Sequence, residues 1–139
     1  MKVISFVNQK GGVGKTTSCL NIGAALHESG RRVLFIDMDA QGSLTKSTGL
    51  NALPENTPTV SDILTGKADA ASAVIRREGM PDIIPGDIRL SGAEVELIGA
   101  AGRDFILKEA KKDGIGTFEH DEILFVVQGE SEFAENQEE

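Results

Sequence analysis

A glycine-rich loop near the start of the chain joins a short apolar segment to a long helical one. The apolar segment, Lys2–Val7, is rich in β-branched residues and predicts a strand. After the loop, apolar residues recur at helical spacing over Thr16–Ser29, and Gly30 is placed to end a helix. A second apolar run, Val33–Ile36, predicts another strand, ending at Asp37. A strand, a helix and a strand in this order form a βαβ unit, so the sequence predicts an α/β fold with a parallel sheet, flanking helices and a right-handed crossover.

The rest of the chain carries weaker signals. Helices or helical turns are predicted at Gly42–Thr48, from Thr59 or Ser61 through Leu64, and at Asp69–Arg77, Ser91–Ala101 and Asp104–Lys112. Strands are predicted at Pro81–Ile84, before the breaker pair Pro85-Gly86, and at Ile123–Val127, whose unbroken apolar run suits a buried strand. The segment Gly49–Pro58 is predicted to be a loop.

The residues of the glycine-rich loop suit the binding of phosphate groups. Gly11, Gly12 and Gly14 allow a tight backbone turn, so that successive N–H groups can point at anionic oxygens. The helix that follows adds the positive end of its dipole. Lys15 is placed to reach the β- and γ-phosphates, and the Thr16 hydroxyl to complete a magnesium shell. A plain glycine turn before a helix is the alternative, but it leaves the Gly-Lys-Thr order at the strand-to-helix junction unexplained. The sequence therefore predicts a P-loop NTPase that binds ATP and Mg²⁺.

Two carboxylates follow the second predicted strand. Ligands of parallel α/β sheets bind beyond the carboxyl ends of the strands, so Asp37 and Asp39 are expected near the phosphate loop. There they could hold magnesium through its waters and orient an attacking water. A turn with capping carboxylates is the alternative, and it would be preferred if the phosphate loop were absent.

Charge is distributed unevenly along the chain. The formal net charge is −8, and residues 119–139 hold eight of the 22 acidic residues but no Lys or Arg, so the rest of the chain is neutral. An acidic end opposes binding to a phosphate backbone, so DNA binding by this chain alone is expected to be weak. We predict a nucleotide-binding domain over residues 1–128 and an acidic, disordered tail over 129–139.

One cysteine and the absence of a long apolar run bear on location. Cys19 cannot form an intramolecular disulfide and fits a reducing cytoplasm. No run of apolar residues approaches the ~20 that a membrane span needs. We therefore expect a cytoplasmic protein without a membrane partner.

The loop resembles a specific family. The segment Lys10–Thr17 reads Lys-Gly-Gly-Val-Gly-Lys-Thr-Thr and is similar, without a mismatch, to the deviant Walker A loop of the ParA/Soj/MinD ATPases. The stretch from Asp37 to Gly42 resembles the family's Asp-x-Asp-Pro-Gln-Gly segment, with Ala40 in place of the proline. Weaker similarity continues to about Lys112 and looks closest to the chromosome- and plasmid-partitioning branch.

This resemblance implies roles for individual residues. The nucleotide-binding residues would be Lys10, Gly11, Gly12, Val13, Gly14, Lys15, Thr16 and Thr17. Lys10, Lys15 and Asp39 would be catalytic: Lys10 would reach the nucleotide of a partner subunit, and Asp39 would position the hydrolytic water. Thr16 and Asp37 would serve the metal. The implied partners are a second copy of the chain, in an ATP-dependent dimer, and a partner partitioning protein.

The resemblance covers only the N-terminal half of the family fold. Family members follow with an apolar strand that ends in Asp, whereas here the corresponding run, Ile123–Val127, leads to Gln128. The adenine-recognition loop and the later basic helices have no counterpart. Two functions therefore stay open: an ATPase of DNA segregation, or a nucleotide-binding and dimerisation module with little hydrolysis. A third possibility is a fragment that folds poorly alone, because half a sheet leaves an open edge.

Overall fold

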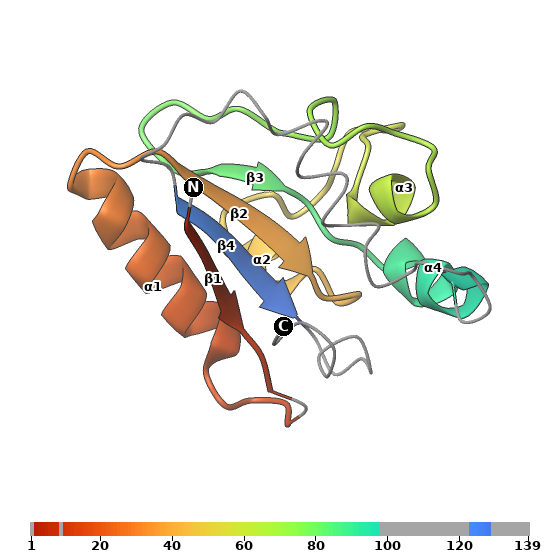
Figure 1. Ribbon diagram of the computed structural model, residues 1–139, viewed down its shortest axis with the longest axis horizontal. Coiled ribbons are helices and arrows are strands. Elements are labelled where there is room, and N and C mark those ends of the chain that lie inside the picture. Colours follow the sequence, from red (N-terminus) through yellow and green to blue (C-terminus); the bar gives the residue numbers. More distant parts are fainter. Residues whose placement is uncertain (1, 9, 98–122, 129–139) are drawn as a thin grey trace.

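The computed structural model describes residues 2–8, 10–97 and 123–128 and contains a single parallel sheet flanked by helices (Figure 1). The elements in chain order are β1 (Lys2–Phe6), α1 (Lys15–Glu28), β2 (Val33–Met38), α2 (Ser43–Ser47), α3 (Val60–Leu64), β3 (Asp82–Ile84), α4 (Arg89–Leu97) and β4 (Ile123–Gln128). The strand order is β1-β4-β2-β3, and each neighbouring pair is parallel. The predicted α/β fold with a parallel sheet is confirmed.

The last described strand lies in the middle of the sheet. β4 pairs with β1 through Val3 and Leu124 and with β2 through Leu34 and Leu124. Strand β3 pairs on the far side of β2, where Ile36 stands opposite Ile84. Because all strands are parallel, their carboxyl ends meet at one edge of the sheet, where the arrowheads of β1, β4 and β2 point in Figure 1.

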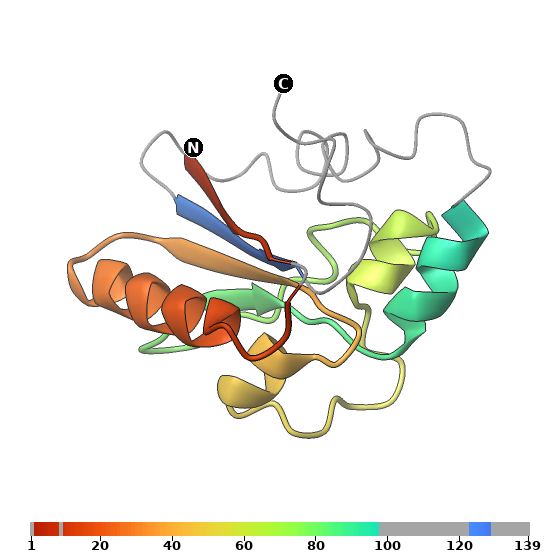
Figure 2. The ribbon, with the colours of Figure 1, turned by 90° about the horizontal axis from the view of Figure 1, so that it is seen from below.

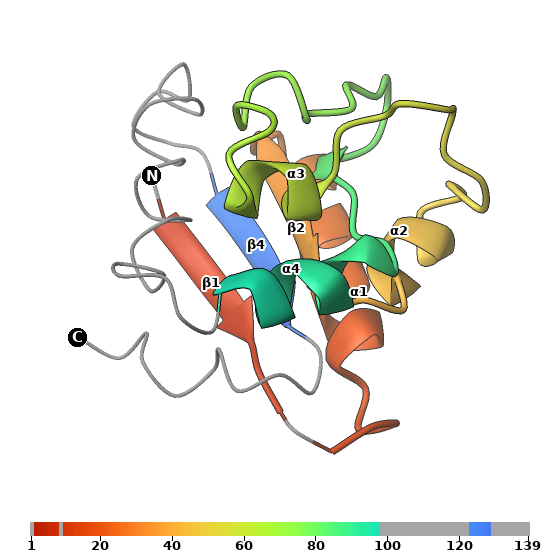
Figure 3. The same cartoon turned by 90° about the vertical axis from the view of Figure 1, so that its right-hand side faces the viewer.

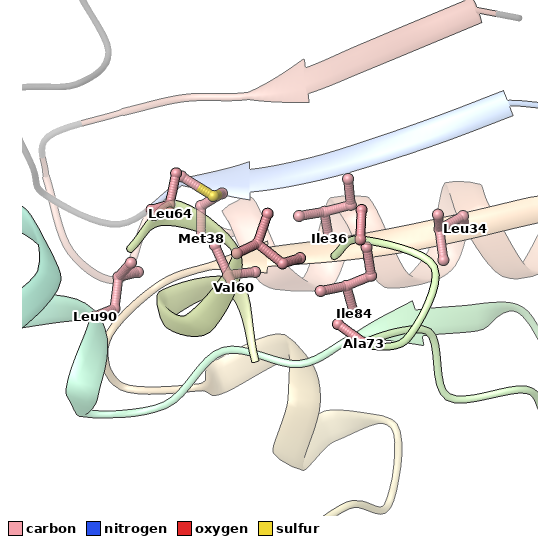
Figure 4. Close-up of a cluster of buried hydrophobic side chains, with 10 residues drawn as sticks. Leu34, Ile36, Met38, Val60, Leu64, Ala73, Ile84 and Leu90 are labelled. Carbon is pink, nitrogen blue, oxygen red and sulfur yellow. The ribbon is translucent and has the colours of Figure 1, made fainter. Parts of the chain in front are cut away.

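Two groups of helices cover the two faces of the sheet (Figure 2). Helices α1 and α2 lie on one face, where Cys19 and Leu44 pack with Val33 and Phe35. Helices α3 and α4 lie side by side on the other face (Figure 3). There Leu34, Ile36 and Met38 join a second cluster with Val60, Ile63, Leu64, Ala70, Ala73, Ile84 and Leu90 (Figure 4). Side chains alternate along β2, so this one strand supplies both cores.

The helix ends follow from local sequence. Gly30, at φ 86°, takes the left-handed conformation after α1, and the Arg31 amide then donates to the Leu26 carbonyl at 3.1 Å. Of the two predicted starts of this turn, Thr59 and Ser61, the structure has Thr59 as the N-cap, because the Asp62 carboxylate accepts the Thr59 amide at 2.8 Å. Gly49–Pro58 contains no helix or strand, as predicted.

The predicted helix over Asp69–Arg77 is wrong. The Asp69 side chain accepts the Ser72 amide at 2.8 Å and closes a short turn instead. Ile75 then forms an isolated antiparallel bridge with Ile83. The two residues exchange backbone hydrogen bonds, with distances of 2.8 and 3.1 Å between nitrogen and oxygen. This pairing uses backbone groups that a helix would have needed, so a tertiary contact overrides the local pattern.

Other predicted boundaries shift by a few residues. Strand β2 continues through Met38, so Asp37 lies inside the strand and not after it. Helix α4 starts at Arg89, before the predicted Ser91, and is described as far as Leu97. The predicted helix at Asp104–Lys112 and the predicted disordered tail at 129–139 lie outside the described residues. Among the helices that the structure describes, none is long and apolar enough to cross a membrane.

Candidate nucleotide site

The phosphate loop connects the end of β1 to the start of α1. Gly12 and Gly14 have φ values of 72° and 87°, in the left-handed region, and Gly14 is the N-cap of α1. A Cβ at either position would meet nothing within 4 Å, so the need for glycine here comes from the backbone conformation and not from crowding. The Ser18 amide donates to the Gly14 carbonyl at 2.9 Å, which begins the helical hydrogen-bond pattern.

A cavity of about 850 Å³ opens beside this loop. It is bounded by three parts of the chain: the loop with the first turn of α1, the segment after β2, and helix α4. Its lining residues are Gly11, Gly12, Val13, Gly14, Lys15, Thr16, Thr17, Met38, Asp39, Ala40, Gln41, Ser43 and Ser91. This volume suits a ligand of nucleotide size, and the cavity lies at the carboxyl ends of the strands.

The two lysines of the loop differ in position. The Lys15 ammonium donates to the Lys10 carbonyl at 2.9 Å, which holds it over the loop and within the cavity lining. Lys10 is exposed and does not belong to the lining, while its amide donates to Asn8 Oδ1 at 2.9 Å. The structure thus brings seven of the eight predicted nucleotide-binding residues, Gly11 to Thr17, around one cavity.

The carboxylates Asp37 and Asp39 also have different surroundings. Asp39 is half-buried, lines the cavity, and accepts the Gln41 amide on Oδ1 at 2.9 Å. Asp37 is fully buried and lies outside the lining. Its Oδ2 accepts the Thr45 amide at 2.8 Å and the Thr45 hydroxyl at 2.6 Å, and its Oδ1 accepts the Asp39 amide at 3.2 Å.

Burial raises the pKa of Asp37 to about 6, although hydrogen bonds from Thr45 and Asp39 work in the opposite direction. In this arrangement the Asp37 carboxylate organises the segment that carries Asp39. The metal role predicted for Asp37 stays a prediction. Of the predicted metal and catalytic residues, Thr16, Lys15 and Asp39 line the cavity.

The residues present fit a magnesium nucleotide. The loop offers backbone N–H groups and a lysine ammonium for phosphate oxygens, and the start of α1 adds its dipole. Thr16 and Asp39 supply a hydroxyl and a carboxylate, which are the oxygen ligands that Mg²⁺ prefers. Mg²⁺ keeps several waters and is shared with substrate phosphates, so few protein ligands are needed.

Sequence reasoning missed part of the lining. Gln41 lies in the stretch from Asp37 to Gly42 and Ser43 in the helix predicted at Gly42–Thr48, but no role was predicted for either residue. Ser91 comes from α4, about 75 residues after the phosphate loop, and no local pattern marks it. The available signal was the breaker pair Pro85-Gly86, because the loop after every parallel strand reaches the same edge of the sheet.

Comparison with known proteins identifies the family. A model of the AAA domain family matches residues 1–125. The chromosome partitioning protein ParA of Caulobacter vibrioides is 43% identical over 112 residues, which are 79% of this chain and 41% of that protein. The sporulation initiation inhibitor protein Soj of Bacillus subtilis is 42% identical over 111 residues, which are 78% of this chain and 43% of Soj.

A solved structure is also similar. Cobyrinic acid a,c-diamide synthase of Mycobacterium smegmatis, crystallised with ADP and magnesium, superposes with a TM-score of 0.80 at 40% identity, covering 94% of this chain and 52% of that one. The chain thus spans about two fifths of the length of the curated relatives it matches. The chain belongs to the AAA domain family, and its predicted resemblance to the ParA and Soj partitioning ATPases is confirmed.

Proposed function

We propose that this chain binds ATP with magnesium and hydrolyses it as a partitioning ATPase of the ParA and Soj type. The observation that carries the proposal is the single cavity that joins the phosphate loop, Gly11 to Thr17, to Asp39 on the segment after β2. A triphosphate bound by the loop would therefore share the cavity with this segment. The solved relative from Mycobacterium smegmatis holds ADP or an ATP analogue with magnesium, which supports the choice of ligand.

The cavity residues divide the work between binding and chemistry. Lys15 and the loop amides hold the phosphates, and Thr16 completes the magnesium shell. Asp39, which is half-buried and fixed by the Gln41 amide, orients the attacking water. The exposed Lys10 reaches the nucleotide of a second copy of the chain and stabilises the charge that builds during phosphoryl transfer.

Partners follow from the same proposal. The chain forms an ATP-dependent homodimer in the cytoplasm and acts with a partner partitioning protein, as the resemblance implies. Alone, it binds DNA weakly, because its excess of acidic over basic residues lies at one end of the chain and no basic stripe compensates for it.

A second candidate is a nucleotide-binding and dimerisation module without turnover. The end of β4 favours it: this strand lies between β1 and β2, and its last residue, Gln128, pairs with Met38 at the edge of the sheet where the cavity lies. The resemblance to the ParA/Soj/MinD family implies a carboxylate at the end of the corresponding strand, whereas this chain has an amide. The second candidate therefore predicts magnesium-dependent binding of ATP with negligible phosphate release.

One experiment separates the two functions. Light scattering and phosphate release are measured with ATP and magnesium for the wild type, Lys10→Gln and Asp39→Ala. An active ATPase gives a monomeric Lys10→Gln that still binds ATP. Its Asp39→Ala variant stays a dimer that turns over at least ten times more slowly, because positioned-base effects reach about 10²–10⁴.

Matched variants control for a general loss of charge. Lys67→Gln and Glu55→Ala change exposed residues outside the cavity lining and should behave like the wild type. If neither Lys10→Gln nor Asp39→Ala changes dimerisation or phosphate release, the ATPase proposal is wrong. Negligible phosphate release from a wild type that binds ATP would favour the second candidate.

A further inference from the structure

The hydroxyl of Thr45, in α2, joins β2 to the segment that follows β3, which is much later in the sequence. It donates to Asp37 Oδ2 in β2 at 2.6 Å and accepts the amide of Gly86, which follows β3, at 3.0 Å. The Thr45 amide donates to the same Asp37 oxygen at 2.8 Å. Asp37 is fully buried and Thr45 is 2% exposed, so these groups have little access to water as a substitute partner.

These contacts hold together the two ends of the segment that forms one wall of the nucleotide cavity. Asp37 and Thr45 bracket Met38, Asp39, Ala40, Gln41 and Ser43, the residues that this segment contributes to the lining. Because one carboxylate oxygen holds both the amide and the hydroxyl of Thr45, the two ends of the segment are tied together at its base.

The contact with Gly86 holds this wall against a second wall of the cavity, which contains Ser91 of α4. A Cβ on Gly86 would stand 2.4 Å from the Asp37 carbonyl oxygen and 2.9 Å from that of Asp39, so the two backbones are in direct contact. The chain continues from Gly86 into α4, which brings Ser91 to the cavity. Thr45 thus lies at the point where the wall carrying Asp39 meets the wall carrying Ser91.

We propose that Thr45 is a positioning residue, whose hydroxyl sets the place of Asp39 and α4 relative to the phosphate loop. It lies outside the lining of the nucleotide cavity and acts through Asp37 and Gly86. For the identity of the ligand in the cavity, this inference rests on the proposed function. It implies that losing the hydroxyl weakens the magnesium-dependent part of nucleotide affinity, because a bound magnesium nucleotide would share the cavity with the wall that carries Asp39, and spares the part that depends on the phosphate loop alone.

The test compares two substitutions of Thr45 in the full chain. Thr45→Val keeps the shape of the side chain and removes the hydroxyl, whereas Thr45→Ser keeps the hydroxyl. Amide hydrogen exchange is followed over residues 38–43 and 87–91 without nucleotide. ATP affinity is measured by calorimetry with magnesium and again with a chelator.

We expect Thr45→Val to speed exchange in both segments at least tenfold. Magnesium raises ATP affinity, and Thr45→Val should reduce this gain by at least fivefold. Its ATP affinity in the chelator should change less than twofold. Thr45→Ser should restore both quantities to within twofold of the wild type. If Thr45→Val does not fold, Thr45→Ala removes the hydroxyl with a smaller side chain, and the same criteria apply.

Thr48→Val is the matched control. Thr48 is also buried, and its hydroxyl donates at 2.8 Å to the Thr45 carbonyl, away from Asp37 and Gly86. It should lower the melting temperature and leave the magnesium-dependent gain unchanged. The proposal is overturned if Thr45→Val exchanges like the wild type, if affinity falls equally with and without magnesium, or if Thr48→Val reproduces the full effect. A wild type that binds no nucleotide would refute the proposed function, and the exchange measurement would still decide the role of Thr45.

Discussion

The ring of Phe35 in β2 lies directly against the backbone of Gly23 in α1. A Cβ at residue 23 would stand 2.2 Å from the ring Cε1 atom and 2.5 Å from Cζ, well inside contact distance. Both residues are buried, and Phe35 is one of the largest fully buried side chains among the described residues. This close approach lets α1 pack tightly against the sheet. The packing of α1 in turn positions the phosphate loop, which precedes the helix, at the carboxyl ends of the strands.

Gly23→Ala should therefore destabilise the fold. A methyl group gains helix propensity of about 1 kcal/mol, but overpacking against a buried ring costs roughly 1–3 kcal/mol, so we expect a net loss of up to about 2 kcal/mol. Gly92→Ala is the matched control, because Gly92 lies in α4 and a Cβ there would meet nothing within 4 Å. Chemical denaturation measures both variants. Equal stabilities of Gly23→Ala and Gly92→Ala would contradict the close packing of Phe35 against Gly23.

Lys15→Ala should weaken ATP binding. The ammonium lines the cavity and would lose a charge-assisted contact with phosphate of roughly 1.5–3 kcal/mol, which corresponds to about a ten- to hundredfold change in Kd. Titration calorimetry checks this, with Lys67→Ala as an exposed control outside the lining. Equal affinity of Lys15→Ala and the wild type would show that the phosphates bind elsewhere.

The buried Asp37 should make stability depend on pH. Its pKa rises from the usual 3.8 to about 6 in the folded chain because burial disfavours the charged carboxylate. Between these values the folded state binds more protons than the unfolded state, so the free energy of unfolding falls as pH rises from about 4 to 6. The fall attributable to Asp37 is about 3 kcal/mol at most.

Asp37→Asn isolates this effect from the other carboxylates. Stability of the wild type minus that of Asp37→Asn should decrease over the same pH window, measured by denaturant unfolding without nucleotide or magnesium. A difference that stays constant with pH would mean that the Asp37 carboxylate is better solvated than its complete burial implies.

Cys19 should resist thiol reagents in the folded chain. Burial raises the pKa of its thiol to about 12, and the nearby charge of Asp37 adds to the effect. Because the thiolate is the reactive form, labelling by a disulfide reagent at pH 8 should be at least about 100-fold slower than in denaturant. The unfolded chain supplies the control, with one reactive thiol per chain. Rapid labelling under native conditions would indicate local opening of α1 from the sheet.

Local sequence determined the phosphate loop and the elements beside it. The glycines at Gly12 and Gly14, the apolar spacing of α1 and the apolar run of β2 act over a few residues each, so their structure could be predicted without knowing the rest of the fold. A turn beginning at Thr59 or Ser61 was predictable for the same reason, and the structure selects Thr59, whose partner Asp62 is three residues away.

Only the tertiary structure decided which distant residues meet. It placed β4 between β1 and β2, paired Ile75 with Ile83 in place of a helix, and brought Ser91 to the cavity. It also separated two carboxylates that lie two residues apart in the motif, because Asp37 is inside β2 and bonds to the buried Thr45, while Asp39 follows the end of the strand and lines the cavity. Such outcomes depend on which surfaces are buried together, and burial is a property of the packed chain that no short window of sequence contains.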